Sequence, residues 1–592
     1  MAHLFIDIET EVVHERNGIP QPSVDDKLKL ISWKDHRGEK GIITIDNIYD
    51  IQQLIKKYPV IIGFNLKGYD IPILEKNGCS FQYKIILDIY DIIKKHLDKI
   101  KALKSLKSLS LDSIATALEL KEQKDTTFDY GLLKGDNWKE HLAEISVYAL
   151  QDIAVTEELF IWLADFFEPF KYGLGELDIA RYKHMTVKTS VYAYKVICRK
   201  TGIKEEYNDN VGDYKGQFEG GYVAEPEEEL IVDDIIEIDI GSAYPHAYMQ
   251  ANLFSNDCKC CKEEEKYDGG HIFTLQGRYC SKQQGIIEKT IKEIYCERLK
   301  FKKEKNRIEY ALKILLNIIY GICANPRFKN VYNLKRAADC THIGRETIKY
   351  VRARLKLLGY NTLYSDTDSV FVKLNGHTEE ELQRDVEAII KDIKSSVAFP
   401  QDTFKMPLDK RIKLMYFPRK MKKNYLYVTK NNELIIKGLK IIKCNNQKVS
   451  TVVFNKYIKP KIINELVVKF DGTQIKEWIE AELQNDISLA TISVKASNKE
   501  YKNENQINNQ IYKTYGKGVH DLVPNFKIGV GIGVRLCTPE EFKTAGLDVK
   551  DINIQQAYNE LQIFTDMPLV CKSMVTVKGR KRMINTLEQW LR

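Results

Sequence analysis

The sequence predicts a multidomain protein of mixed α/β and α+β class. A chain of 592 residues is too long for one hydrophobic core and should divide into about four sub-domains. In the N-terminal part, strand patterns occur at 3–8, 28–33 and 59–64. Helical patterns follow at 84–98, 105–120 and 143–167. Strands interleaved with helices in this order indicate an α/β domain over roughly 1–170.

The middle of the chain combines one strand, two helices and two hairpins. A strand is expected at 231–240, and residues 286–321 have the periodicity of two helices joined near Asn306. Two β-prone runs separated by a polar turn occur at 361–374 and again at 423–442. These hairpins would belong to an α+β part.

The composition indicates which class of protein this is, but it does not identify a binding partner. Lys and Arg total 90 against 82 for Asp and Glu, so the net charge of +8 is compatible with a polyanionic partner without identifying one. The 12 cysteines form no regular framework, which favours a reducing, intracellular compartment. No stretch approaches the roughly 20 apolar residues that span a bilayer, so no membrane association is expected.

A first group of carboxylates lies in the N-terminal domain. Asp7 and Glu9 are two apart on a strand and share a face, and Tyr148 and Asp152 are four apart on one face of a helix. Asp70 follows another strand. Four carboxylates converging at one sheet edge would suit two Mg²⁺ or Mn²⁺ ions, which hydrolyse phosphodiesters by activating water and stabilising charge. Each pair alone would be ordinary surface chemistry.

A second group centres on the first hairpin. Asp366 and Asp368 lie at its tip, and Asp239 ends the strand at 231–240. Carboxylates from two strands can hold two metal ions for nucleotidyl transfer. The alternative is an acidic β-turn, because Asp and Ser favour turns. Candidate groups for binding a triphosphate occur at helical spacing on the two helices of 286–321: Arg298, Lys302, Lys313, Asn317, Tyr320 and Gly321.

These segments resemble known motifs, in the correct order from residue 3 to about 443. DIET (7–10), NLKGYD (65–70) and YALQD (148–152) are similar to the three exonuclease motifs of proofreading DNA polymerases. Five further segments resemble polymerase motifs of family B: FEGGYV (218–223), DIGSAYP (239–245), KILLNIIYG (313–321), YSDTDS (364–369), and KKNYLY with KGLKIIK (422–427, 437–443). Ala243, Ile318 and Phe218 depart from the usual Leu, Ser and Tyr, which leaves fidelity rather than activity in doubt.

The resemblance implies a ribonuclease H-like exonuclease domain followed by a right-hand polymerase. The implied domains are an exonuclease (1–170), a connecting region (171–230), a palm (231–256 and 329–432), fingers (257–328), and a thumb with the C-terminal tail (433–592).

The resemblance also implies residue roles. Exonuclease metal ligands would be Asp7, Glu9, Asp70 and Asp152, with Asn65, Tyr69 and Tyr148 handling the single-stranded primer end. In the polymerase, Asp239 and Asp368 would be the principal ligands, with Asp366 nearby. Tyr244 would stack under the sugar and exclude a 2′-hydroxyl, beside Ser242 and Thr367 in the substrate site. DNA contacts would come from Gly220, Gly221, Lys423, Tyr425 and Lys437.

The expected function is template-directed DNA synthesis from dNTPs with 3′→5′ proofreading. The alternatives are an exonuclease, or a DNA-binding subunit, that retains a decayed polymerase half. Asn317 lies 78 positions after Asp239 and 49 before Asp366, intervals too short for the large insertions of protein-primed relatives, so a nucleic-acid primer is favoured. We expect a monomer that binds primer-template DNA. The short chain, with no domain before the exonuclease, favours a virus or mobile element.

Two further features have open interpretations. INTLEQWL near the C-terminus resembles a sliding-clamp-binding peptide, with Leu587, Trp590 and Leu591 as its hydrophobic plug, or else forms a terminal helix that packs on its own protein. Cys258, Cys260, Cys261 and Cys280 cluster in the predicted fingers. Because C-x-C-C is not a usual zinc-finger spacing, we expect reduced thiols there, with a structural Zn²⁺ as the alternative.

Overall fold

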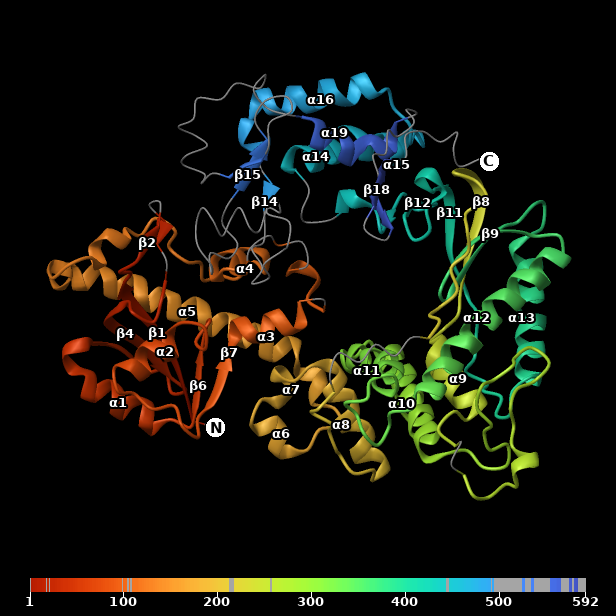
Figure 1. Ribbon diagram of the computed structural model, residues 1–592, viewed down its shortest axis with the longest axis horizontal. Helices are drawn as coiled ribbons and strands as arrows, with labels where there is room; N and C mark the ends of the chain where they lie inside the picture. The colour runs from red at the N-terminus through yellow and green to blue at the C-terminus, as the bar shows by residue number, and fades with distance from the viewer. Residues whose placement is uncertain are drawn as a thin grey trace. The chain divides into compact units, whose positions relative to one another are not determined.

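A computed structural model gives the fold of this protein in two compact units (Figure 1). The first is formed mainly by Met1–Glu228 and Val232–Lys413, and the second by Glu229–Ile231 with Leu414–Ser493 and later segments. The structure describes residues 2–16, 19–20, 22–97, 99–103, 106, 109–211, 218–255, 258–442, 447–490, 492–493, 524–527, 534–536, 554–565, 574–577 and 580–583.

The N-terminal part of the first unit is built on a five-stranded sheet of order β5-β4-β1-β6-β7. Strand β1 pairs antiparallel with β4 and parallel with β6, so it lies at the centre of the sheet. The strands are β1 (His3–Glu11), β4 (Lys27–Asp35), β5 (Lys40–Thr44), β6 (Val60–Gly63) and β7 (Ile85–Asp88), beside a short hairpin of β2 (Glu15–Arg16) and β3 (Ile19–Pro20).

Helices cover this sheet and connect it to the next region. The long helix α5 packs against β1 and β4, and Tyr148, Asp152 and Ile153 are among its buried residues. The helices are α1 (Ile48–Lys57), α2 (Asp70–Lys76), α3 (Ile89–His96), α4 (Leu111–Ala117), α5 (Leu142–Phe166), α6 (Glu176–Ala180), α7 (Lys183–Thr186) and α8 (Thr189–Thr201).

Two sequence expectations in this region need correction. The helix expected at 84–98 is wrong over its first turn, because residues 85–88 form β7, which pairs in parallel with β6. The run Ile85-Ile86-Leu87 is apolar at every position, and such a run suits a buried parallel strand as well as a helix. The helix expected at 105–120 is shorter in the structure, where α4 spans Leu111–Ala117.

A second sheet has the strand order β13-β12-β11-β8-β10-β9. Both expected hairpins are present, as β9 with β10 and as β12 with β13. The strands are β8 (Leu230–Asp239), β9 (Asn361–Asp366), β10 (Ser369–Lys373), β11 (Leu408–Tyr416), β12 (Tyr425–Thr429) and β13 (Leu434–Lys437). The turn of the second hairpin contains Asn432, which adopts φ 64°, a left-handed conformation that asparagine tolerates.

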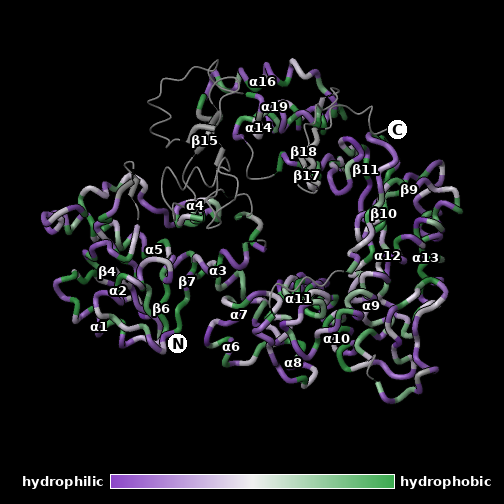
Figure 2. Tube along the Cα trace, viewed as in Figure 1, coloured by the Kyte–Doolittle hydropathy of each residue, from purple (hydrophilic) through white to green (hydrophobic). Residues whose placement is uncertain are grey.

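The helices beside the second sheet are α9 (Ala243–Ala251), α10 (Ile286–Lys303), α11 (Ile308–Cys323), α12 (Leu334–Leu357) and α13 (Glu379–Ser395). The two helices expected in 286–321 are therefore present as α10 and α11. Helix α13 begins with a capping box, in which Thr378 and Glu381 each bond the other's backbone N–H. Hydrophobic and hydrophilic residues alternate along it in Figure 2, and its buried side is Leu382, Val386, Ile389 and Ile393.

The second unit has its own hydrophobic core, formed in part by Val453, Ile475 and Leu561. Its further described elements are α14 (Lys448–Val453), α15 (Lys459–Glu465), α16 (Gly472–Asn485), α19 (Gln555–Leu561), β14 (Ile492–Ser493), β15 (Pro524–Lys527), β16 (Val534–Leu536), β17 (Met574–Val577) and β18 (Arg580–Met583). The predicted clamp-binding peptide at 584–591 lies outside the described residues. Among the helices that the structure describes, none is long and apolar enough to cross a membrane.

Candidate active sites

Three acidic side chains of the N-terminal part converge at the centre of its sheet. Asp7 and Glu9 come from β1 and Asp152 from α5, and one carboxylate oxygen of each lies within 4.8 Å of the others. Asp70 begins α2 and is 3% exposed. It faces the same group, since the charge of Asp7 raises the pKa of Asp70. Four acidic residues from three separate segments of sequence are thus brought together by β1, α2 and α5.

The electrostatics of this cluster favour a cation. Burial, and then the charge of Asp152, raise the pKa of Asp7 to about 7. Burial is also the first cause of the raised pKa values of Glu9, Asp70 and Asp152, and repulsion from neighbouring carboxylates adds to it for Glu9 and Asp70. Carboxylates held in this way ionise when positive charge is supplied beside them.

The structure also places a lysine in this cluster that sequence reasoning missed. Lys124 Nζ forms an ion pair with Asp152 Oδ2 and lies 5.0 Å from the centre of the Tyr148 ring. One ammonium group cannot neutralise four carboxylates. Asp152 Oδ1 is buried and has no hydrogen-bond partner within the described parts of the chain. An all-oxygen donor set with an unpaired buried oxygen fits Mg²⁺ or Mn²⁺.

Tyr148 is held by two aromatic residues that sequence reasoning also missed. Its hydroxyl is 2.8 Å from the hydroxyl of Tyr130, and its ring stacks on Phe128 with centroids 4.0 Å apart. Burial raises the pKa of Tyr148 far above its ordinary value, so the hydroxyl stays protonated. The group can therefore act as a hydrogen-bond donor beside Asp152.

The loop 65–70 is shaped by Asp88, whose carboxylate accepts the backbone N–H of Asn65 at 3.0 Å and of Lys67 at 2.9 Å. Asn65 itself takes φ 59°. The Tyr69 hydroxyl donates to Asp26 at 2.7 Å and lies 2.5 Å from Thr10 Oγ1. In this structure Tyr69 therefore ties its loop to β1.

A second acidic group lies where β8, β9 and β10 meet. Strand β9 ends at Asp366 and β10 begins at Ser369, so Thr367 and Asp368 form the turn, with φ 64° at Thr367. Ser369 pairs with Asp239 across the sheet, and the N–H of Ile240 donates to the carbonyl of Asp368 at 2.8 Å. The hairpin register thus brings Asp368 beside Asp239.

Besides burial, repulsion between these two carboxylates raises the pKa of Asp239. Burial, and next the charge of Asp368, raise the pKa of Asp239 to about 6, while Lys410 and Lys313 lower it. Lys410 is itself paired with buried Glu237 at 2.9 Å. A partly buried aspartate whose pKa is raised by a neighbouring aspartate, at the ends of paired strands, also fits a divalent cation.

Arg298 is the most firmly held of the predicted triphosphate ligands. Its Nε and Nη2 each lie 2.9 Å from Glu309 Oε1, and its Nη1 donates to Ser242 Oγ at 3.0 Å. Its side chain is 12% exposed. Glu309, on α11, was not identified from the sequence, although it fixes the guanidinium in place.

The remaining predicted nucleotide ligands lie on α10, α11 and the start of α9. Lys302, Lys313, Asn317 and Gly321 are exposed. The Tyr244 ring packs on Tyr320 at a centroid distance of 5.0 Å. On another side, Tyr244 Cε1 would be 3.4 Å from a Cβ at Gly344, so α12 passes close by. Both neighbours limit the movement of Tyr244.

The segment of Gly220 and Gly221 is anchored by α12. Arg345 Nη1 donates to the carbonyls of Glu219 at 2.6 Å and Gly220 at 3.0 Å. Beyond it, the N–H of Thr367 donates to the carbonyl of Tyr222 at 2.8 Å. The glycine segment therefore lies directly beside the turn that carries Asp368.

The predicted DNA contacts of the second unit differ in their exposure. Tyr425 on β12 pairs with Lys437 on β13. Lys423 and Lys437 are exposed, whereas Tyr425 is 4% exposed and packs against Phe417 and Tyr427. The two lysines can therefore meet a phosphate backbone directly, while Tyr425 offers little surface.

Comparison with known families identifies the chain. The model of DNA polymerase family B matches residues 187–523, more than half of the sequence. The chain belongs to DNA polymerase family B. The model of the RNase_H superfamily matches residues 4–164, which contain the first acidic cluster. The expected fold class, a ribonuclease H-like domain followed by a family B polymerase, is confirmed.

The chain is also similar, at low identity, to curated DNA polymerases. DNA polymerase 1 of Aeropyrum pernix is 21% identical over 504 residues, covering 76% of this chain and 49% of that protein. A DNA polymerase of Archaeoglobus fulgidus is 25% identical over 474 residues, covering 72% and 56%. The family B chain thus spans about half the length of these relatives.

A solved structure shares the fold. It is the family B DNA polymerase from the hyperthermophilic archaeon Pyrobaculum calidifontis, with a TM-score of 0.58 and 17% identity over 96% of this chain and 79% of that one.

Proposed function

We propose that this chain synthesises DNA from dNTPs on a primer-template and removes nucleotides from the 3′ end at a separate site. The observation that carries the proposal is the presence of two acidic groups in two matched regions. Asp239 and Asp368 lie within the family B match, and Asp7, Glu9 and Asp152 lie within the RNase_H match. A chain with a decayed polymerase half would have no reason to keep Asp239 and Asp368 near Lys313 and the ordered Arg298.

For synthesis, Asp239 and Asp368 would hold divalent ions, with Asp366 nearby, and such ions supply charge stabilisation at the primer 3′-oxygen and the triphosphate. The chain's own contribution is positioning. Arg298, fixed by Glu309 and Ser242, would bind the triphosphate together with the exposed Lys302 and Lys313. An aromatic ring that cannot move away from the sugar excludes a 2′-hydroxyl, and Tyr244 is confined in this way by Tyr320 and α12.

For 3′-end removal, the ligands would be Asp7, Glu9, Asp70 and Asp152. The protonated hydroxyl of Tyr148 would donate a hydrogen bond that orients the attacking water. Lys124 would offset part of the negative charge while the site exchanges its cations. Asn65 and Tyr69 would line the path of the single-stranded end.

The partners and setting belong to the same proposal. Primer-template DNA would bind mainly through phosphate contacts to residues such as Lys423 and Lys437. A nucleic-acid primer, a monomeric enzyme inside a cell, and a sliding clamp bound through the C-terminal peptide remain part of this proposal.

Two variants test the separation of activities on a 5′-labelled primer-template. Asp239→Ala should abolish extension and keep 3′-end degradation, whereas Asp7→Ala should do the reverse. Each variant is the matched control for the folding of the other. If the wild-type chain extends no primer with either Mg²⁺ or Mn²⁺, the decayed-polymerase alternative is correct.

A further inference from the structure

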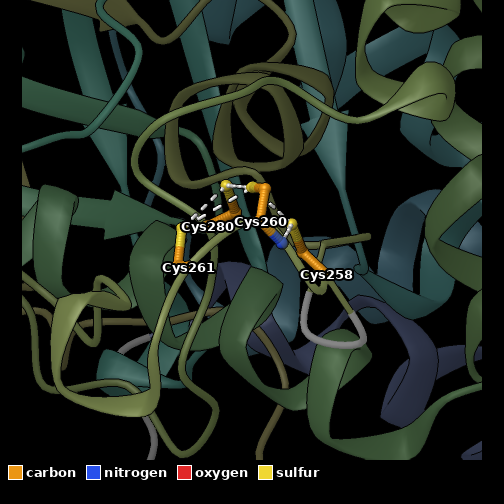
Figure 3. Close-up of side chains that lie close together, drawn as sticks. All are labelled: Cys258, Cys260, Cys261 and Cys280. Atoms are coloured by element: carbon orange, nitrogen blue, oxygen red, sulfur yellow. Dashed lines mark hydrogen bonds between the residues drawn. The ribbon is translucent and has the colours of Figure 1, made fainter.

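Four cysteine side chains from the segment that connects α9 to α10 lie close together (Figure 3). Cys258, Cys260 and Cys261 come from one loop, and Cys280 comes from the segment before α10. All four Sγ atoms lie within 4.8 Å of one another. The individual distances are 2.7 Å for 258–260, 3.1 Å for 260–280, 3.3 Å for 261–280 and 3.7 Å for 260–261.

This spacing discriminates between the roles that four cysteines can have. Disulfide sulfurs are about 2.05 Å apart, and all four of these thiols are free. A zinc–sulfur bond of about 2.3 Å makes the edge of a tetrahedron about 3.8 Å long. The 3.7 Å separation matches such an edge, and the other three, 2.7 to 3.3 Å, lie between a disulfide bond and that edge. The four sulfurs are thus gathered around one centre, and binding an ion there would move them apart by up to about 1 Å.

We propose that Cys258, Cys260, Cys261 and Cys280 bind one Zn²⁺ ion in a tetrahedral, structural site. This reverses the expectation of reduced thiols, which rested on the unusual C-x-C-C spacing. The spacing was a weak guide because the fourth ligand, Cys280, is brought in by the fold rather than by the local sequence. Four protein sulfurs around one ion leave no open position for a substrate, which is the pattern of a structural rather than a catalytic zinc.

Hydrogen bonds to the sulfurs support thiolate ligands. The N–H of Gln283 donates to Cys280 Sγ, and the N–H of Cys260 donates to Cys258 Sγ, both at 3.3 Å. Donors of this kind stabilise and orient metal-bound thiolates. Four thiolates with one Zn²⁺ would carry about two negative charges, and Lys259, Lys262 and Lys282 lie in the same two segments.

The position of the cluster suggests what the ion does. Asn252, which follows α9, donates from Nδ2 to the carbonyls of Cys280 at 2.7 Å and Gln283 at 3.0 Å. Its Oδ1 accepts the N–H of Gly285, the N-cap of α10, at 2.9 Å. The zinc site would therefore fasten the loop to the junction of α9, which carries Tyr244 in its first turn, and α10, which carries Arg298.

The first test is the metal content of the full chain, purified without chelator and measured by mass spectrometry. We expect about one zinc per chain. The double variant Cys260→Ser/Cys280→Ser should lose it, and the matched variant Cys296→Ser should keep it, because Cys296 is an exposed, free cysteine outside the cluster. Metal content does not depend on DNA synthesis, so this test stands apart from the proposed function.

A second test needs no variant. Chelation of the wild-type chain should make four further thiols reactive and lower its melting temperature, and Zn²⁺ but not Mg²⁺ should restore both. Cobalt added to the chelated chain should give the visible bands of tetrahedral thiolate coordination. The proposal is overturned if chain dialysed against zinc retains less than about 0.2 ions per molecule. Iron in place of zinc, a disulfide within the cluster, or unchanged thiol reactivity would overturn it as well.

Discussion

Alanine at position 221 would press on the turn that carries Asp368. A Cβ on Gly221 would lie 2.8 Å from Cγ2 of Thr367 and 3.3 Å from its Cβ and Oγ1. Rotating the threonine does not remove the conflict, because its Cβ is itself too close. The strands cannot simply separate, since the N–H of Thr367 is bonded to the carbonyl of Tyr222. The turn between Asp366 and Asp368 must therefore move.

The size of the movement follows from these contacts. Ordinary van der Waals contact begins at 3.4 Å, so the shift needed from 2.8 Å is about 0.6 Å. A misplacement of about 1 Å at a catalytic centre can lower the rate about 100-fold. We therefore expect Gly221→Ala to slow nucleotide incorporation about tenfold. Overpacking of this kind costs about 1–3 kcal/mol, which leaves the chain folded.

The assay is single-nucleotide incorporation at saturating DNA, with 3′-end degradation of single-stranded DNA measured in the same preparation. Degradation should stay at the wild-type rate. Gly220→Ala is the matched control, because a Cβ there would meet nothing within 4 Å. Saturating DNA removes any effect of that position on DNA binding. Wild-type incorporation by Gly221→Ala, or equal loss in both variants, would refute the reasoning.

Three further outcomes are expected. In Arg298→Lys, the lysine cannot keep the contacts to both Glu309 and Ser242, so the KM for dNTP should rise about tenfold or more. Lys300→Ala, on the exposed side of the same helix, is the control and should leave this KM unchanged. Burial raises the pKa of Glu288 from 4.5 to about 7, so between these pH values the carboxyl is protonated in the folded state but ionised in the unfolded state. The free energy of unfolding should therefore fall by up to about 3 kcal/mol as the pH rises from 4.5 to 7. Melting curves from pH 5 to 8 should show this loss for the wild type and a flatter profile for Glu288→Gln; parallel profiles would contradict it. Lys423→Ala should lower the slope of log Kd for DNA against log salt by about one, whereas an unchanged slope would remove Lys423 from the DNA contacts.

Local periodicity was sufficient to predict the position of a side chain or hairpin where all of its residues belong to one short segment. Asp7 and Glu9 are two apart, and a strand places such residues on one face whatever surrounds it. The hairpin 361–374 was equally predictable, because two β-prone runs flank a turn. Periodicity failed at 85–88, where an entirely apolar run does not distinguish a strand from a helix and pairing with β6 decides.

The candidate sites show the same limit. Lys124 and Phe128 lie in a segment without regular periodicity, so only the fold reveals that they reach Asp152 and Tyr148. In the sequence, nothing distinguishes Glu309 from other charged residues of a helix. Only the packing of α10 against α11 places it beside Arg298. Tyr425, predicted to hold the primer, is nearly buried, because its position in β12 points the ring at Phe417 and Tyr427.

The order and spacing of its acidic motifs were enough to indicate the fold class, the family and the metal chemistry of this protein. Such motifs are short, and the strand or turn that carries each one is encoded within a few residues. Tertiary structure alone decided which side chains complete those sites, that Gly221 borders Thr367, and that Cys280 meets three cysteines about twenty positions earlier. Contacts between distant segments depend on the packing of whole helices and sheets, and no local pattern in the chain specifies that packing.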